Sequence, residues 1–190
     1  MVSICWFCTA VNCIPLLVQQ NVDGTNAFNR SWAEFKVGFN DSRGNFWLGN
    51  ELLHQLTKTG RYKLRFDLQT RNNGNWQYAE YSRFIVTSEA TNYLMHVSGY
   101  SGNAGTAGSG SARYGFLHHD GMMFTAYDRD NDPWNNSNYR NNCAVYNGGG
   151  FWYKDCSRAS VNAVRGRGDK FRWYGGRTVY LQTSRMWLTC

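Results

Sequence analysis

Three aspartates and two cysteines between Asp128 and Cys156 are the residues of this chain whose types and spacing best suit chemistry. The segment reads DRDNDPWNNSNYRNNCAVYNGGGFWYKDC. Asp128, Asp130 and Asp132 alternate along it, and hard cations prefer carboxylate and carbonyl oxygens. Cys143 and Cys156 flank a glycine turn and could close a loop, which would contribute ~3 kcal/mol in the chain-entropy model. The segment therefore predicts a metal-braced binding surface.

An EF-hand does not account for this pattern. The aspartates occupy its first, third and fifth positions, but Pro133 stands at the sixth, where glycine is needed, and Tyr139 replaces the glutamate at the twelfth. The alternative to a metal site is a solvated turn, in which the aspartates only cap backbone amides.

The histidines give no sign of catalysis. His54, His96, His118 and His119 show no metal-ligand spacing with acids, and the chain has neither a G-x-S-x-G elbow nor a phosphate-binding loop. We predict that the protein is not an enzyme.

Positive charge is concentrated near the C-terminus. The net charge is +7, and the chain from Ser157 onward contains seven basic residues and one acidic residue, Asp169. Such asymmetry favours an anionic partner. No nucleic-acid-binding motif is present, so we expect an acidic or sulfated glycan rather than nucleic acid. A solvated basic face without a ligand is the alternative.

Several features favour a secreted, extracellular glycoprotein. Sequons begin at Asn29, Asn40 and Asn135, and Cys143 and Cys156 suit an oxidising compartment.

The first fifteen residues differ from the rest. They carry no charge and contain Cys5, Cys8 and Cys13. A signal peptide would need a basic start, a membrane helix would be interrupted by Asn12 and Pro15, and a zinc site would need a second cysteine pair. All three interpretations of this segment stay open, and no membrane insertion is expected. Residues 16–190 are predicted to form one domain. Cys190 could pair with an N-terminal cysteine, join another chain or stay free.

The remaining chain alternates short strands and helices. Ser31 and Glu34 have capping-box spacing and predict a helix. Residues 49–56 predict a second helix with Asn50 as its cap and Leu52, Leu53 and Leu56 on one face. Strands are expected over 16–22, 62–68, 76–87, 93–97 and 178–188. The glycine- and serine-rich stretch 98–115 is expected to be a loop.

Several stretches together resemble the C-terminal globular domain of fibrinogen, which also occurs in ficolins, tenascins and angiopoietins. They are VQQNVDG, SWAEFKVGF, GNFWLGNELLHQLT, SGYSGNAG, HDGMMF, DRDND and NCAVYNGGGFWYKDC. The resemblance spans about residues 16–188. It implies an α+β fold with a central twisted antiparallel sheet, short helices, and an irregular calcium- and ligand-binding subdomain built on the Cys143–Cys156 disulfide. It also implies that the domain's usual beginning is absent, so that residues 1–15 could reflect a mis-started gene model.

The resemblance assigns ligands to Ca²⁺. The carboxylates of Asp130 and Asp132 and the backbone carbonyls of Trp134 and Asn136 match the family's calcium site. This chain departs from the family between Asp132 and Cys143, where it is several residues longer.

A ligand pocket beside the disulfide is also implied. In the family a cis peptide precedes the second cysteine, here Asp155 to Cys156, and would turn backbone N–H groups of Cys156 and Ser157 towards a ligand. The further residues of the predicted pocket are Tyr146, Asn147, Tyr153 and Trp173. Ser157 stands where the family commonly has histidine, and the segment up to Trp173 is short.

The resemblance implies lectin-like binding of acetylated or acidic glycans in innate immunity. The alternative is a matrix or signalling ligand that binds a cell-surface protein receptor. Arg167-Gly168-Asp169 is the tripeptide that integrins recognise, provided that it is displayed on an exposed loop. A homo-oligomer could form through upstream regions.

Overall fold

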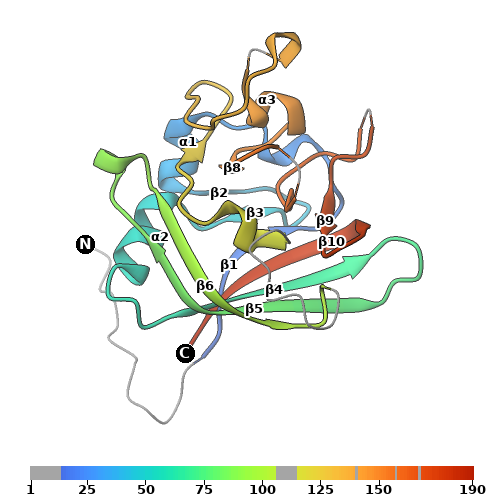
Figure 1. The fold of residues 1–190 in the computed structure, drawn as a ribbon, viewed down its shortest axis with the longest axis horizontal. Coiled ribbons are helices and arrows are strands. Elements are labelled where there is room, and N and C mark those ends of the chain that lie inside the picture. The colour runs from blue at the N-terminus through green and yellow to red at the C-terminus, as the bar shows by residue number, and fades with distance from the viewer. Residues whose placement is uncertain (1–13, 106–114, 140, 157, 167) are drawn as a thin grey trace.

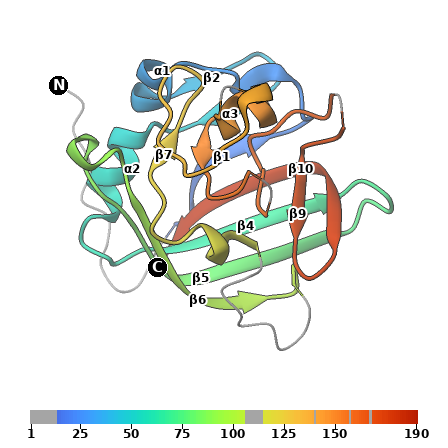
Figure 2. The ribbon, with the colours of Figure 1, turned by 45° about the horizontal axis from the view of Figure 1, so that its top comes forward.

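One mostly antiparallel sheet carries the fold of this computed structural model, which describes residues 14–105, 115–139, 141–156, 158–166 and 168–190. The strand order is β2-β3-β1-β10-β4-β5-β6, with β9 pairing on β10, and the two short strands β7 and β8 form a second sheet. In Figures 1 and 2 the large sheet forms one side of the molecule, and the helices and loops lie against its other face. The α+β fold class predicted from sequence is confirmed.

The strands are β1 (Leu16–Asn21), β2 (Phe39–Asn40), β3 (Phe46–Trp47), β4 (Lys63–Thr70), β5 (Trp76–Val86), β6 (Met95–Gly102), β7 (Phe124–Thr125), β8 (Phe151–Trp152), β9 (Arg172–Tyr174) and β10 (Thr178–Thr189). The helices are α1 (Trp32–Val37), α2 (Asn50–Thr57) and α3 (Cys143–Asn147), with 3-10 turns η1 (Asn26–Phe28), η2 (Glu89–Thr91), η3 (Gly115–His119) and η4 (Ser137–Tyr139).

Strand β10 is the centre of the sheet. It pairs antiparallel with β1 on one side and with β4 on the other, and its first residues pair with β9. Period-2 burial runs cleanly along β4, where every second side chain is buried, as its sequence pattern predicts.

The helix starts show where local signals succeed. Helix α1 begins at the predicted capping box, in which Glu34 N–H donates to the Ser31 hydroxyl and the Glu34 carboxylate accepts from Ser31 N–H. The predicted cap of α2 is wrong. Gly49 is the N-cap, whereas Asn50 is the first helical residue and its buried Oδ1 accepts from Trp47 Nε1 at 3.1 Å.

Two further expectations are corrected. Leu52 is 43% exposed, because the narrow buried stripe of α2 contains Leu53 and Thr57 instead. Strand β6 continues to Gly102, into the stretch expected to be a loop, because β5 supplies partners for its backbone. A Cβ on Gly102 would lie 2.3 Å from the Tyr78 carbonyl, so glycine is what allows this pairing.

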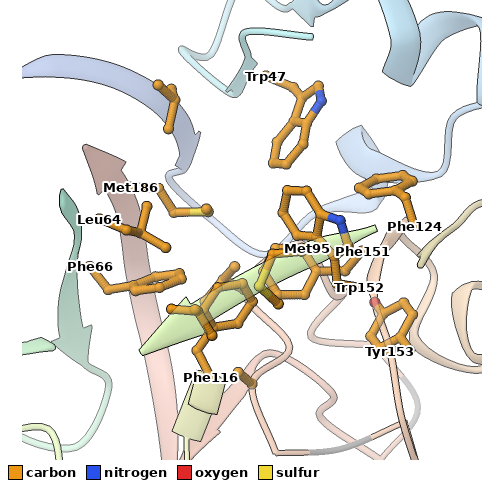
Figure 3. Close-up of a cluster of buried hydrophobic side chains, with 14 of the residues drawn as sticks. Trp47, Leu64, Phe66, Met95, Phe116, Phe124, Phe151, Trp152, Tyr153 and Met186 are labelled. Carbon is orange, nitrogen blue, oxygen red and sulfur yellow. The ribbon is translucent and has the colours of Figure 1, made fainter. Parts of the chain in front are cut away.

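Aromatic rings fill the space between the large sheet and the layer above it. Figure 3 shows Phe66 and Phe116 on one side of this core and Trp47, Phe124 and Trp152 on the other. Trp152 is fully buried, and its Nε1 donates to the Tyr93 carbonyl at 2.7 Å. The core therefore reaches from the sheet to strand β8, which lies within the loop that the Cys143–Cys156 disulfide closes.

Candidate functional site

The three alternating aspartates have different roles. Asp128 Oδ1 accepts a hydrogen bond from the backbone N–H of Trp32 at 2.8 Å, so it pairs one of the N–H groups that the first turn of α1 leaves without a helical partner. Asp130 is exposed, and its Oδ1 accepts the N–H of Asp132 at 3.3 Å. Asp132 is half-buried and points inward. A backbone-to-carboxylate hydrogen bond thus joins Asp130 and Asp132, the two acids that the resemblance assigns to calcium, whereas Asp128 bonds to α1.

Asp132 joins the aspartate loop to the disulfide. Its Oδ1 accepts the N–H of Trp134 and its Oδ2 accepts the N–H of Cys143, both at 3.0 Å. The pKa of Asp132 is raised to about 7, chiefly by burial and also by the negative charge of Asp130, against the lowering effect of the two N–H donors.

This environment suits a hard cation in part. A cation between Asp130 and Asp132 would relieve their repulsion, and oxygen donors are the right kind for Ca²⁺. The carbonyl of Asn136, a predicted ligand, instead accepts from the N–H groups of Tyr139 and Asn141 at 3.1 and 3.0 Å. The extra residues of this loop close into η4 there, so Asn136 does not fit the predicted role. The calcium site and the Trp134 carbonyl stay predictions.

The disulfide between Cys143 and Cys156 is present, with the two Cα atoms 5.0 Å apart. Both sulfur atoms lie near Asp132, but bonded to each other they cannot bind a metal as thiolates. Asn147 braces the loop from inside: its Nδ2 donates to the carbonyls of Cys143 and Cys156 at 3.0 and 2.8 Å. Asn147 is fully buried, so its predicted ligand contact is wrong.

Two predicted pocket walls are also core residues. Tyr153 has no exposed surface, and its hydroxyl donates to the Gly149 carbonyl at 2.7 Å. Trp173 is 1% exposed, and its Nε1 donates to the Ala104 carbonyl at 2.8 Å. Both rings belong to the buried core, and neither can touch a ligand from solvent.

The peptide bond before Cys156 is trans, as are all peptide bonds of the described residues, so the predicted cis bond is wrong. The chain turns here through a left-handed backbone at Cys156, with φ of 68°. Cys156 is 1% exposed, and Ser157 lies outside the described residues.

Tyr146 is the predicted wall that does reach the surface. Its ring lies 5.1 Å from that of Trp134 and 4.8 Å from that of Tyr139, which is 39% exposed. Lys170 Nζ sits 3.6 Å from the centre of the Tyr146 ring and hydrogen-bonds its hydroxyl. We call Trp134, Tyr139, Tyr146 and Lys170 the aromatic cluster. It combines an apolar surface with a cation and lies beside the disulfide.

Sequence reasoning missed Tyr139 and Lys170. Tyr139 lies in the part of the loop that is longer than in the family, and Lys170 was counted only among the basic residues. The single usable signal was an aromatic residue within an otherwise polar run, NNSNYRNN.

Two adjacent histidines contact the loop that the disulfide closes. His119 is fully buried, where its Nδ1 donates to the Trp152 carbonyl at 2.6 Å and its Nε2 accepts the N–H of Ala159 at 3.1 Å. Burial, with repulsion from His118, lowers the pKa of His119 to about 3, so the ring is neutral. His118 Nε2 lies 3.1 Å from a carboxylate oxygen of Asp155, the residue that precedes Cys156.

The integrin-type tripeptide is not displayed as recognition requires. Asp169 forms an ion pair with Arg71, and its side chain is 18% exposed. Arg167 lies outside the described residues. Asn29, Asn40 and Asn135 are exposed, as glycosylation would require, and their modification stays a prediction.

The N-terminal predictions lie outside the described residues, including the pairing of Cys5, Cys8 and Cys13. Cys190 is disulfide-bonded, which excludes a free thiol there. Among the described residues, no helix combines the length and the apolar character needed to cross a bilayer.

Curated relatives share more than a third of their aligned residues with this chain. The human fibrinogen alpha chain is 38% identical over 181 residues, covering 92% of this chain and 20% of that protein. Bovine fibroleukin is 40% identical, covering 77% and 31%, and fibrinogen-like protein A of Apostichopus parvimensis is 36% identical, covering 85% and 52%. The chain thus spans between about a fifth and a half of these relatives.

Solved structures agree with the fold. The fibrinogen-like globe domain of human ANGPTL2 matches with a TM-score of 0.74 and 32% identity, covering 92% of this chain and 79% of that one. Lamprey fibrin D-dimer, in complex with the peptide Gly-His-Arg-Pro-amide, matches with a TM-score of 0.69 and 28% identity, covering 91% and 60%. Residues 5–187 match the model of the C-terminal globular domain of fibrinogen beta and gamma chains, and the chain belongs to that family.

Proposed function

We propose that this chain is a secreted recognition domain that binds acetylated carbohydrates at the aromatic cluster, with Ca²⁺ held by Asp130 and Asp132. The observation that carries the proposal is the partly exposed Tyr146, which packs against the rings of Trp134 and Tyr139 and against Lys170 and belongs to α3, the helix that begins at Cys143. Exposed rings stack on the apolar faces of sugars, and Lys170 can donate to a carbonyl oxygen.

Calcium has a supporting part in this proposal. The Asp132 carboxylate accepts hydrogen bonds from the N–H groups of both Trp134 and Cys143. A change in its charge or position would therefore affect the aromatic cluster and the disulfide together. An ion on Asp130 and Asp132 would fix the loop that carries Trp134 and Tyr139. Sugar binding is therefore expected to require calcium even though the ion need not touch the sugar.

A binding assay on N-acetylglucosamine-terminated glycans tests the proposal. We expect binding in millimolar calcium and its loss in EDTA, and about a fivefold weaker affinity for Tyr139→Ala, since a ring contact contributes about 1 kcal/mol. Tyr78→Ala is the matched control, because Tyr78 is 37% exposed and lies on β5. Absence of binding with calcium, or equal losses in both variants, would reject the proposal.

A protein or peptide ligand is the second candidate. The matching lamprey fibrin fragment holds a short peptide amide, which favours this class. If the ligand is a protein, a receptor ectodomain or a peptide would bind saturably, and free N-acetylglucosamine would not displace it. If the site binds sugar, free N-acetylglucosamine would compete with the bound glycan.

A further inference from the structure

A hollow lies between two hairpins, at the end of β4. It encloses about 360 Å³ and is formed by the β4–β5 turn together with the first residues of β10. Arg71 enters from the turn and Arg177 from the segment before β10. The backbone N–H of Arg71 donates to the Tyr180 carbonyl at 2.9 Å, which ties the two hairpins together at this point.

An adjoining hollow of about 270 Å³ lengthens this space. It shares Gln77, Arg177 and Val179 with the first hollow, and it continues past Asn103 and the glycines of the β9–β10 turn. Arg177 therefore stands at the junction of the two hollows. We call the pair the hairpin groove.

The groove is cationic and rich in amides. Asn72, Asn73, Gln77 and Asn103 contribute amide side chains, and among the described residues no aspartate or glutamate lines either hollow. Asp169 pairs with Arg71 from outside the lining, which fixes that guanidinium and offsets its charge, so the positive charge of the groove comes chiefly from Arg177. Arg177 is exposed, and its fork of N–H donors suits sulfate and carboxylate groups.

We propose that the hairpin groove binds an acidic oligosaccharide, separately from the aromatic cluster. Arg177 would contact a sulfate or carboxylate group, the N–H groups of Arg71 that Asp169 leaves available could add to this contact, and the amides would contact sugar hydroxyls. Nucleic acid fits less well, because single strands need free aromatic faces for stacking. The one aromatic residue among the described lining residues, Tyr180, has the Arg71 guanidinium 5.3 Å above its ring.

Arg177→Gln and Arg61→Gln form a matched pair for the test. Both remove one exposed positive charge, but Arg61 precedes the first residue of β4, whereas the groove begins after its last. The eight residues of β4 separate the two positions by roughly 26 Å. Loss of net charge alone would affect both variants equally.

The full chain would be titrated with a heparin-derived hexasaccharide and with a hexamer of uronic acid that carries only carboxylates. We expect Arg177→Gln to weaken binding about tenfold, Arg61→Gln to leave it within twofold, and added salt to weaken all of them. The hexamer that binds better identifies the anionic group. N-acetylglucosamine binding is expected to be unchanged in Arg177→Gln, which separates this site from the aromatic cluster.

Two results would overturn the assignment. Equal losses in the two arginine variants would show that diffuse charge attracts the glycan. Tighter binding of a single-stranded DNA oligonucleotide, with the same dependence on Arg177, would assign the groove to nucleic acid instead.

Discussion

Asp132 Oδ2 and the backbone N–H of Cys143 are 3.0 Å apart, so the aspartate loop and the disulfide form one hydrogen-bonded unit. A change at either end of this bond is expected to reach the other, and the aromatic cluster that both support.

Calcium is predicted to raise the melting temperature through Asp132. A ligand present at 100 times its Kd stabilises by about 2.7 kcal/mol, and each kcal/mol shifts Tm by about 2–4 °C in a domain of this size. Asp132→Asn should abolish the shift between EDTA and calcium. Asp128→Asn removes the same charge but only weakens the start of α1, so it should keep the shift. If calcium does not shift the melting temperature of the wild type, the prediction of a calcium site is rejected.

Loss of the disulfide is predicted to destabilise the fold. The bond joins residues 13 positions apart, and the paired change Cys143→Ser with Cys156→Ser should cost about 3 kcal/mol of unfolding free energy. Urea denaturation measures it. Since Tyr146 lies in α3 between the two cysteines, the variant should also lose sugar binding at temperatures where it remains folded. Full binding in this variant would contradict the role given to the disulfide.

Acid is predicted to destabilise the protein through His119. The pKa of His119 is about 3 in the fold, against 6.5 for an ordinary histidine. Between these values the unfolded chain binds a proton that the folded chain does not, so stability falls as pH falls from about 6.5 to 3. The contribution approaches ~1.4 kcal/mol per pH unit.

His119→Gln isolates this effect. Its amide offers a donor and an acceptor but does not titrate. Its shape differs from that of the imidazole, so the variant should be less stable at pH 7, yet it should lose less stability than the wild type between pH 7 and 4.5. Urea unfolding at the two pH values gives the comparison. Parallel losses in both proteins would show that other groups cause the acid sensitivity.

Gly38→Ala is predicted to destabilise by more than about 2 kcal/mol. Gly38 has φ of 92°, and a Cβ there would lie 2.5 Å from the Leu48 carbonyl oxygen. Gly121 has φ of 76° with nothing within 4 Å of a Cβ, so Gly121→Ala should cost only the ~1 kcal/mol of backbone strain. Thermal melts of both variants would test the difference, and equal costs would mean that the backbone at Gly38 relaxes freely.

Local signals predicted the local structure well. The Ser31 capping box depends on two residues three positions apart, and the burial of β4 follows its own alternation. The extension of β6 could not be predicted in this way, because glycine-rich sequence has no strand preference of its own and β5 supplies the partners.

The candidate site was harder to predict than the fold. Asp130, Asp132 and the disulfide follow from sequence spacing and resemblance. Tyr146, Tyr153 and Trp173 look alike in the sequence, yet only Tyr146 reaches the surface, because burial depends on which element covers each ring. Likewise, Lys170 meets Tyr146 only through the fold, 24 positions along the chain.

The central place of β10 governs the order in which the sheet can assemble during synthesis. Strands β1 to β3 and strands β4 to β6 each pair among themselves, and among the described strands β10 alone connects the two groups. Until residues 178–189 have left the ribosome, β1 and β4 both present open edges that could pair with other chains. A chain that ends before β10 would therefore lack the strand that joins the two groups, and the edges of β1 and β4 would stay open to pairing with other chains.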